Sequence, residues 1–373
     1  MKTILTLAAT LLLAYGSTAA PNAVPACDDT GTVVHTAKPR RVKGSERLVT
    51  RDLGRIGAYE VLYVSDGIEA VVSAAVSTLV ITADDNVIDR IVTRSDGKRL
   101  TMRIDARSIT DCTVRAVIPA SAALRTLEAE SMGTIRCEVP LGNGPGPVTV
   151  RSSEGSRIAA DIRTGDDIRV HVSGCSRFEG ALKGNNCKIS VTEGSVFDAP
   201  LTCEVHGEII LDASSRFAGD ASAGNSLHIK AANGSVMQGN ADADVVLVHA
   251  TASSHYNGSI SAAGQAELKS TDGSVIAGAF AGGHIYAVST ASSRIALTGS
   301  TPVPSAVIEV ASGSRFSAPA LPLRNCSVTA TSSGHAEVRC TGELLATTSS
   351  GGTVFYNDDC RVTTNNPYVR KQD

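Results

Sequence analysis

The sequence predicts an all-β fold, a single-stranded parallel β-helix (solenoid) of about twelve rungs of ~20 residues with an N-terminal β cap. Three observations predict it. A short Ser-centred motif recurs at a nearly constant interval, apolar residues alternate with polar ones around it, and the core has few large rings. The 373 residues include no Trp, 7 Tyr and 6 Phe. Val, Ile, Leu and Ala must therefore fill the core, which suits thin, stacked β-structure.

The repeat is the strongest signal. Its nine clear copies resemble GSRI, SSRF and GSVF, and successive central serines lie 19 to 21 residues apart. These serines are Ser156, Ser176, Ser195, Ser215, Ser235, Ser254, Ser274, Ser293 and Ser314. Weaker copies around Gly133, Gly334 and Gly352 complete the twelve units. A fixed period near 20 residues is the signature of a solenoid.

The residues flanking the motif indicate strands. The position six residues before each serine is always apolar, and the position two residues after it is always large, as in Phe178, Phe197 and Phe217. Positions eight, six and four residues before the serine share one face, which is the period of two of a strand. We therefore expect each unit to contain a strand, a tight turn, a second short strand and a loop. Stacking buries the apolar face, and no long segment with a helical period interrupts the repeats.

The remaining segments define the predicted organisation. Residues 1–19 are typical of a secretory signal peptide, with Lys2 before an apolar run and small residues before the cleavage point. An N-terminal membrane anchor is disfavoured because that run is short, and a lipoprotein site at Cys27 because Pro25 lies beside it. Residues 20–43 form a flexible lead-in, 44–123 the β cap with a hairpin at Asp96-Gly97, 124–362 the β-helix, and 363–373 a polar tail. No other apolar stretch is long enough to span a membrane, so the mature chain is expected in the periplasm, on the cell surface or secreted.

The order of segments resembles the family "putative auto-transporter adhesin, head GIN domain". The resemblance starts at RLVTRD (residues 47–52) and continues through YEVLYVSDGIEAVVS, LVITADDNVIDRIV, DGKRLTMRI and VRAVIPASAALRTLEAESMGTI. The Ser/Gly rungs and SSGGTVFYNDDCRV (residues 349–362) follow. The resemblance implies a β-helical envelope or surface protein and brings no catalytic residues. The number of rungs leaves open one extended domain or two fused ones.

The outward position next to the serine carries a column of cations. It comprises Arg157, Arg177, Arg216, His255, Arg294 and Arg315. The column is either a track for an anionic ligand, such as an acidic glycan, or a solvated face whose long side chains cover apolar strands. The formal net charge of −3 argues against nucleic-acid binding.

Catalytic and metal-ligating patterns are not found in the sequence. A polysaccharide-active enzyme needs clustered carboxylates on adjacent rungs. Asp242 and Asp244 are the best pair, although acids in loops are expected for solubility alone. No histidine pair has metal-ligand spacing with a carboxylate, and no CxxC pair occurs. We expect no catalytic residues, no metal and no cofactor.

Nine cysteines in an exported chain permit disulfides. Cys340 and Cys360 lie one unit apart and are expected to bridge neighbouring rungs. Cys112 and Cys137 are expected to tie the cap to the first rung. Cys187 and Cys326 fall in an inward column, so they are expected to be buried free thiols.

Three functions follow, in order of preference. The first is an exported non-enzymatic β-helix with a structural or adhesive role at the cell envelope, whose partner is a glycan or an envelope or surface protein. The second is a polysaccharide lyase or hydrolase. The third is a binding module for an anionic glycan. Clustered carboxylates in one groove would favour the enzyme, and a continuous arginine stripe would favour the binding module.

Overall fold

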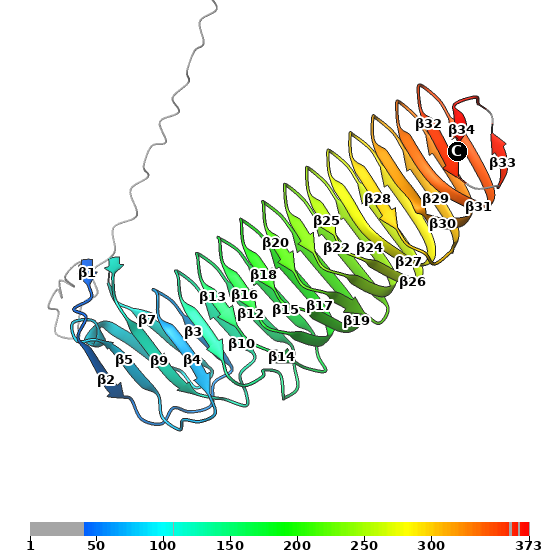
Figure 1. Cartoon of the computed structure of the whole chain (residues 1–373). Helices are drawn as coiled ribbons and strands as arrows, with labels where there is room; N and C mark the ends of the chain where they lie inside the picture. Colours follow the sequence, from blue (N-terminus) through cyan, green and yellow to red (C-terminus); the bar gives the residue numbers. More distant parts are fainter. Residues whose placement is uncertain (1–40, 107, 358–359, 365, 373) are drawn as a thin grey trace, which may run out of the picture. The chain divides into compact units, whose positions relative to one another are not determined.

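The computed structural model describes residues 41–106, 108–357, 360–364 and 366–372. They form a parallel β-solenoid of about twelve turns, as predicted (Figure 1). The expected signal peptide and all but the end of the lead-in lie outside the described residues. Within the described part of the chain, no helix is long and apolar enough to cross a bilayer.

The rungs have three walls, whereas the repeat predicted two strands and a loop. Wall A comprises β7 (Arg99–Ile104), β3 (Val61–Val64), β10 (Thr126–Ala129), β12 (Val148–Ser152), β15 (Ile168–Val172), β22 (Ser226–Ala231), β29 (Val303–Val310) and β33 (Arg361–Thr364). Wall B comprises β9 (Val114–Pro119), β4 (Glu69–Ser73), β11 (Thr134–Cys137), β13 (Arg157–Ala159), β16 (Arg177–Glu179), β18 (Val196–Asp198), β20 (Arg216–Ala218), β23 (Val236–Gln238), β25 (His255–Asn257), β28 (Arg294–Thr298), β32 (Thr353–Asn357) and β34 (Val369–Lys371).

Wall C occupies the segment that was expected to be a loop. It begins with β14 (Ile162–Arg163) and includes β21 (Ala221–Ala223). Long strands bend around the corners and join two or three walls within one element. They are β17 (Leu182–Val191), β19 (Leu201–Leu211), β24 (Ala241–Ala250), β26 (Ile260–Ser270), β27 (Val275–Ser289), β30 (Arg315–Ala330) and β31 (His335–Thr348). In β17, β19, β24 and β26 the first half lies in wall C and the second half in wall A of the next rung.

The region predicted as a cap continues the stack. Strands β7 and β3 extend wall A in parallel, and β9 and β4 extend wall B. Antiparallel strands close this end: β6 (Ile91–Ser95) pairs with β7, and β2 (Leu48–Asp52) pairs with β5 (Val80–Asp84), which itself pairs with β9. The β6–β7 pair is the hairpin predicted at Asp96-Gly97. The short helix η1 (Ile88–Arg90) and the pair β1 (Arg41–Lys43) and β8 (Ser108–Thr110) complete this end.

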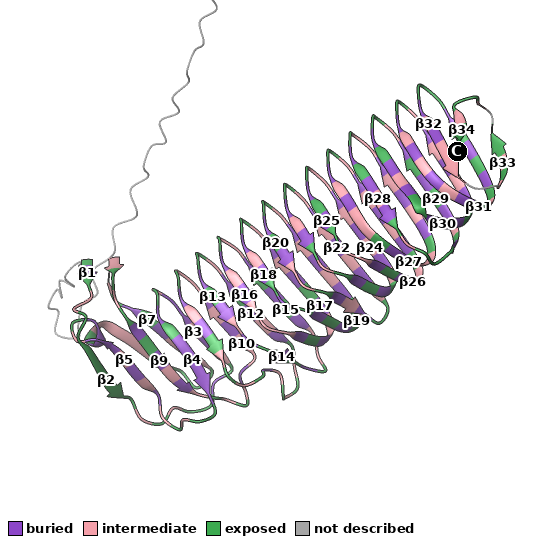
Figure 2. Ribbon diagram, viewed as in Figure 1, coloured by how far each residue is buried: buried purple, intermediate pink, exposed green. Residues whose placement is uncertain are grey.

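Buried residues alternate with more exposed ones along the strands (Figure 2), and the buried ones form the core. The rings of Phe178, Phe197 and Phe217 stack with centroids 5.1 and 4.8 Å apart, one ring per rung. Met237 and Tyr256 continue this column, and all five side chains are buried. The columns predicted from the sequence are therefore the core.

The repeated serines form a buried ladder at the turn between walls A and B. The backbone N–H of Ser156 donates to the Oγ of Ser176 (3.1 Å), and Ser176 donates likewise to Ser195 (3.1 Å). The two residues before each serine have positive φ, for example Glu154 (54°) and Gly155 (74°). Glycine adopts this left-handed conformation without a steric cost, which explains the glycine of the Gly-Ser motifs. At the other end of the stack, β34 pairs with β32, so the expected tail contributes a strand.

Candidate functional site

The predicted cation column lies in one outward row of wall B. Register pairs Arg157 with Arg177, and Arg294 with Arg315, while valines separate Arg216 and His255 from their neighbours. The row is thus assembled as expected, but its charges are not equivalent, because carboxylates of the next outward position reach several of them.

Acidic partners compensate both ends of this row. Glu179 accepts hydrogen bonds from Arg157 and from Arg177 (2.6 Å), and Asp198 also pairs with Arg177. The hydrogen bond from Arg157 is the main reason that the pKa of Glu179 lies below its usual value. At the far end, Arg315 pairs with Glu337 at 3.3 Å. Half of the row, Arg157, Arg177 and Arg315, is therefore ion-paired.

A different pair of cations lies in an open groove on wall C. Arg163 of β14 and Lys183 of β17 are register partners in adjacent rungs, and both are exposed. No carboxylate oxygen of the described residues lies within 4.0 Å of either cation. Thr202 of β19 follows Lys183 in the same outward row. The groove has a volume of about 510 Å³, within the usual range for ligand sites.

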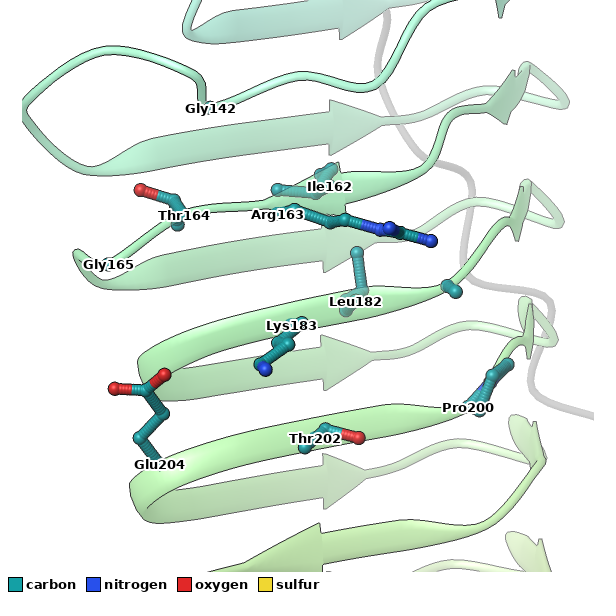
Figure 3. Close-up of a pocket in the computed structure, with 11 residues that line it drawn as sticks. Gly142, Ile162, Arg163, Thr164, Gly165, Leu182, Lys183, Pro200, Thr202 and Glu204 are labelled. Carbon is teal, nitrogen blue, oxygen red and sulfur yellow. The ribbon is translucent and has the colours of Figure 1, made fainter.

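The close-up in Figure 3 shows how the groove is built. Ile162 and Leu182 lie buried beneath the groove, Pro200 is exposed at it, and Arg163, Lys183, Thr202 and Glu204 contribute polar groups. Residues 142–147 (GNGPGP) precede wall C and form no strand, because Pro has no amide hydrogen to donate to a ladder. The isolated bridge between Leu141 and Ile162 holds the start of this loop above the groove.

A second groove of similar size, about 520 Å³, lies on wall A. Its charged groups satisfy one another: Lys188 pairs with Glu208 at 2.8 Å, and Arg169 with Asp167 at 3.8 Å. The Nδ2 of Asn186 donates to Asp167 at 2.9 Å. This groove has no uncompensated charge to offer, in contrast to the groove on wall C.

The acids considered for catalysis do not form an enclosed site. Asp242 and Asp244 alternate outward on β24, and both are exposed. Of the residues that line the wall C groove, Glu204 alone is acidic. Among the described residues, no group of three or more His, Cys, Asp or Glu side chains is arranged to hold a metal ion.

The eight described cysteines are unbonded thiols. Cys112 and Cys137 are not brought together as expected. Val72 pairs with both Cys137 and Ile118, and Cys112 precedes Ile118 by six residues, or about 20 Å of extended chain, far beyond disulfide reach. Cys340, by contrast, contacts both Cys326 and its expected partner Cys360.

The sequence reasoning did not single out Arg163 and Lys183. Each stands seven residues after a repeat serine, Ser156 or Ser176. That common offset was the available signal, but it fell in a segment interpreted as a loop.

Comparison with known protein families identifies one family. The model of the family "putative auto-transporter adhesin, head GIN domain" matches residues 58–238 and 247–359, which is more than half of the chain. No curated protein matches the chain.

Several solved structures are similar to parts of the chain. A putative adhesin from Parabacteroides merdae ATCC 43184 is 14% identical, with 61% of this chain and 95% of that chain covered and a TM-score of 0.37. A putative adhesin from Bacteroides fragilis NCTC 9343 is 15% identical, with 69% and 96% covered and a TM-score of 0.30. A putative lipid binding protein from Parabacteroides distasonis ATCC 8503 is 15% identical, with 89% and 97% covered and a TM-score of 0.24.

Proposed function

Because the chain belongs to the family "putative auto-transporter adhesin, head GIN domain", we propose that it is an exported, non-enzymatic protein with an adhesive role at the cell envelope. The predicted signal peptide at residues 1–19 supports export. Fractionation of cells that express the full chain, with immunodetection of the cytoplasmic and envelope fractions, tests this part. Retention of an uncleaved chain in the cytoplasm would refute export.

The observation that carries the binding role is the pair of uncompensated cations in the wall C groove. Arg163 and Lys183 project from strands about 4.8 Å apart, so their charges repel each other weakly and leave a positive site. An Arg fork and a Lys ammonium together suit a carboxylate or sulfate group. Thr202 adds a hydroxyl in the same row. We therefore propose an acidic polysaccharide as the ligand.

The lining of the groove favours binding over cleavage. Glycoside hydrolysis commonly requires two carboxyl groups on opposite sides of the scissile bond. Glu204 is the single acid that lines this groove, and it has no second carboxylate among the lining residues. Adhesion without turnover is the function that these residues support best.

Binding of the full chain to alginate, to a sulfated polysaccharide and to neutral dextran tests the ligand class. We expect saturable binding to one acidic polymer, weakened by salt, and none to dextran. The double variant Arg163→Ala/Lys183→Ala should bind at least tenfold more weakly. The matched control Arg157→Ala/Arg315→Ala removes two cations from wall B and should bind like the wild type. Loss of binding in the control alone would place the site in the row predicted from the sequence and refute the wall C site.

A further inference from the structure

Two pairs of buried thiols occupy equivalent corners of the solenoid. Cys187 and Cys326 lie in the same inward row at the start of wall A, seven rungs apart. Each of these cysteines has a neighbour one rung further on, Cys203 for Cys187 and Cys340 for Cys326. Cys203 pairs in register with Gly184, three residues before Cys187, and Cys340 pairs with Leu323, three residues before Cys326. All four side chains are buried. The same diagonal arrangement therefore occurs twice.

The first pair has room to react because a glycine adjoins it. Cys187 pairs in register with Gly207, and a Cβ placed on Gly207 would lie 3.1 Å from the Sγ of Cys203. The Sγ of Cys203 thus fills the space beneath Cys187. The Sγ of Cys187 in turn lies 3.9 Å from the carbonyl oxygen of Thr202, the residue before Cys203.

In the second pair, too, one thiol lies close to the backbone beside the other cysteine. The Sγ of Cys340 lies 3.7 Å from the carbonyl oxygen of Arg324, two residues before Cys326. The thiol of Cys326 donates a hydrogen bond to Cys340, which lowers the pKa of Cys340. Cys340 is therefore the thiol of this pair that more readily becomes the attacking thiolate.

We propose that Cys187 with Cys203, and Cys326 with Cys340, are disulfide-forming sites that link consecutive rungs. Each bond forms when a thiolate attacks a disulfide oxidant of the glutathione or thiol–disulfide oxidoreductase class, and the second thiolate then displaces the oxidant's sulfur. Two protons and two electrons leave the pair, and the oxidant is reduced to two thiols. In the cell this modification rests on the proposed export, because oxidising compartments preserve disulfides.

The pairing with Cys326 is preferred over the expected bridge between Cys340 and Cys360. It repeats the corner of Cys187 and Cys203, whereas Cys360 is only partly buried. Both partners contact Cys340, so peptide mapping must distinguish them.

The test uses the purified full chain, refolded in a buffer of reduced and oxidised glutathione so that it does not depend on export. After alkylation, trypsin places Cys187 in residues 184–188 and Cys203 in 189–216. It places Cys326 in residues 325–339, and Cys340 and Cys360 together in 340–361, which cleavage after Glu343 then separates. We expect links between 187 and 203 and between 326 and 340. Free thiols at all four positions, or a link from Cys340 to Cys360 instead, would overturn the corresponding pair.

A stability measurement provides a second readout. The oxidised chain should unfold at a higher guanidinium concentration than the reduced chain, and Cys187→Ala/Cys326→Ala should remove this difference. The matched control Cys175→Ala changes an exposed thiol and should keep it. Equal midpoints for oxidised and reduced wild type would contradict a structural role for these bonds. Failure of export would leave the in vitro links unchanged, so the two proposals fail separately.

Discussion

Replacement of Gly239 by alanine should destabilise the middle of the solenoid. Gly239 lies at the corner between walls B and C with φ of 144°, a conformation that residues with a Cβ rarely adopt. An added Cβ would lie 1.9 Å from the carbonyl oxygen of Gly219 in the preceding rung. Because real contacts of this kind exceed 3.0 Å, one rung must move by more than 1 Å.

The expected cost is about 3 kcal/mol. A strained backbone contributes about 1–3 kcal/mol. Movement of the corner also disturbs the hydrogen bonds from Gly239 N–H to Asn257 O (3.1 Å) and from Asn240 N–H to the Asp220 carboxylate (2.9 Å). Each such bond contributes about 1 kcal/mol.

Guanidinium unfolding of the full chain, followed by far-ultraviolet circular dichroism, measures this effect. Hydrogen exchange should show faster exchange confined to the rungs around Gly239, because repeat arrays open locally. The control is Gly57→Ala, where the added Cβ meets no atom within 4 Å. The control should stay within about 0.5 kcal/mol of the wild type. If both variants unfold at the same denaturant concentration, the close approach at this corner does not limit stability.

Three further changes probe the core, the ladder and the ion pairs. Phe197→Ala should cost about 3–5 kcal/mol by thermal or guanidinium unfolding, because it leaves a cavity between two stacked rings; a loss under 1 kcal/mol would contradict the stacking. Ser215→Ala removes the hydrogen bond from its Oγ to Val191 O (2.8 Å) and should cost about 1–3 kcal/mol, while the exposed Ser261→Ala should be neutral. Glu179→Gln should lower stability by under about 1 kcal/mol near neutral pH, because its partners are exposed. Since the folded pKa of Glu179 lies below its ordinary 4.5, its contribution is complete above pH 4.5 and is lost as the pH falls through the folded value. A wild-type advantage that grows on acidification would refute this sign.

The sequence predicted those parts of the fold that follow from the repeat of about 20 residues. The columns containing Phe178 and Ile189 have a fixed offset from each serine, so their inward direction could be inferred without coordinates. Wall C was missed because β14 has two residues and β21 three, too few to show alternation. The parallel pairing of β3 and β4 with later rungs is non-local, and no local pattern in the cap distinguishes it from a meander.

The candidate site was predictable only in part. The outward row of Arg157 follows from the repeat, but its neutralisation by Glu179 depends on a contact 22 residues away. The charges of Arg163 and Lys183 likewise depend on the neighbouring rungs, whose described residues place no carboxylate beside them. Such compensation depends on side-chain reach between rungs, which periodicity does not determine.

The parallel pairing between rungs also determines how this protein responds to force. The backbone hydrogen bonds that join consecutive rungs run along the direction of stacking, so the rung interfaces carry tension in that direction in series, each bearing the same force. Strands β33 and β34 end the described stack, and each pairs with a single earlier strand, β31 or β32. A pull on this end therefore separates the weakest rung interface first. The force at which the stack yields is set by a single rung interface. Additional rungs therefore make the solenoid longer without making it stronger.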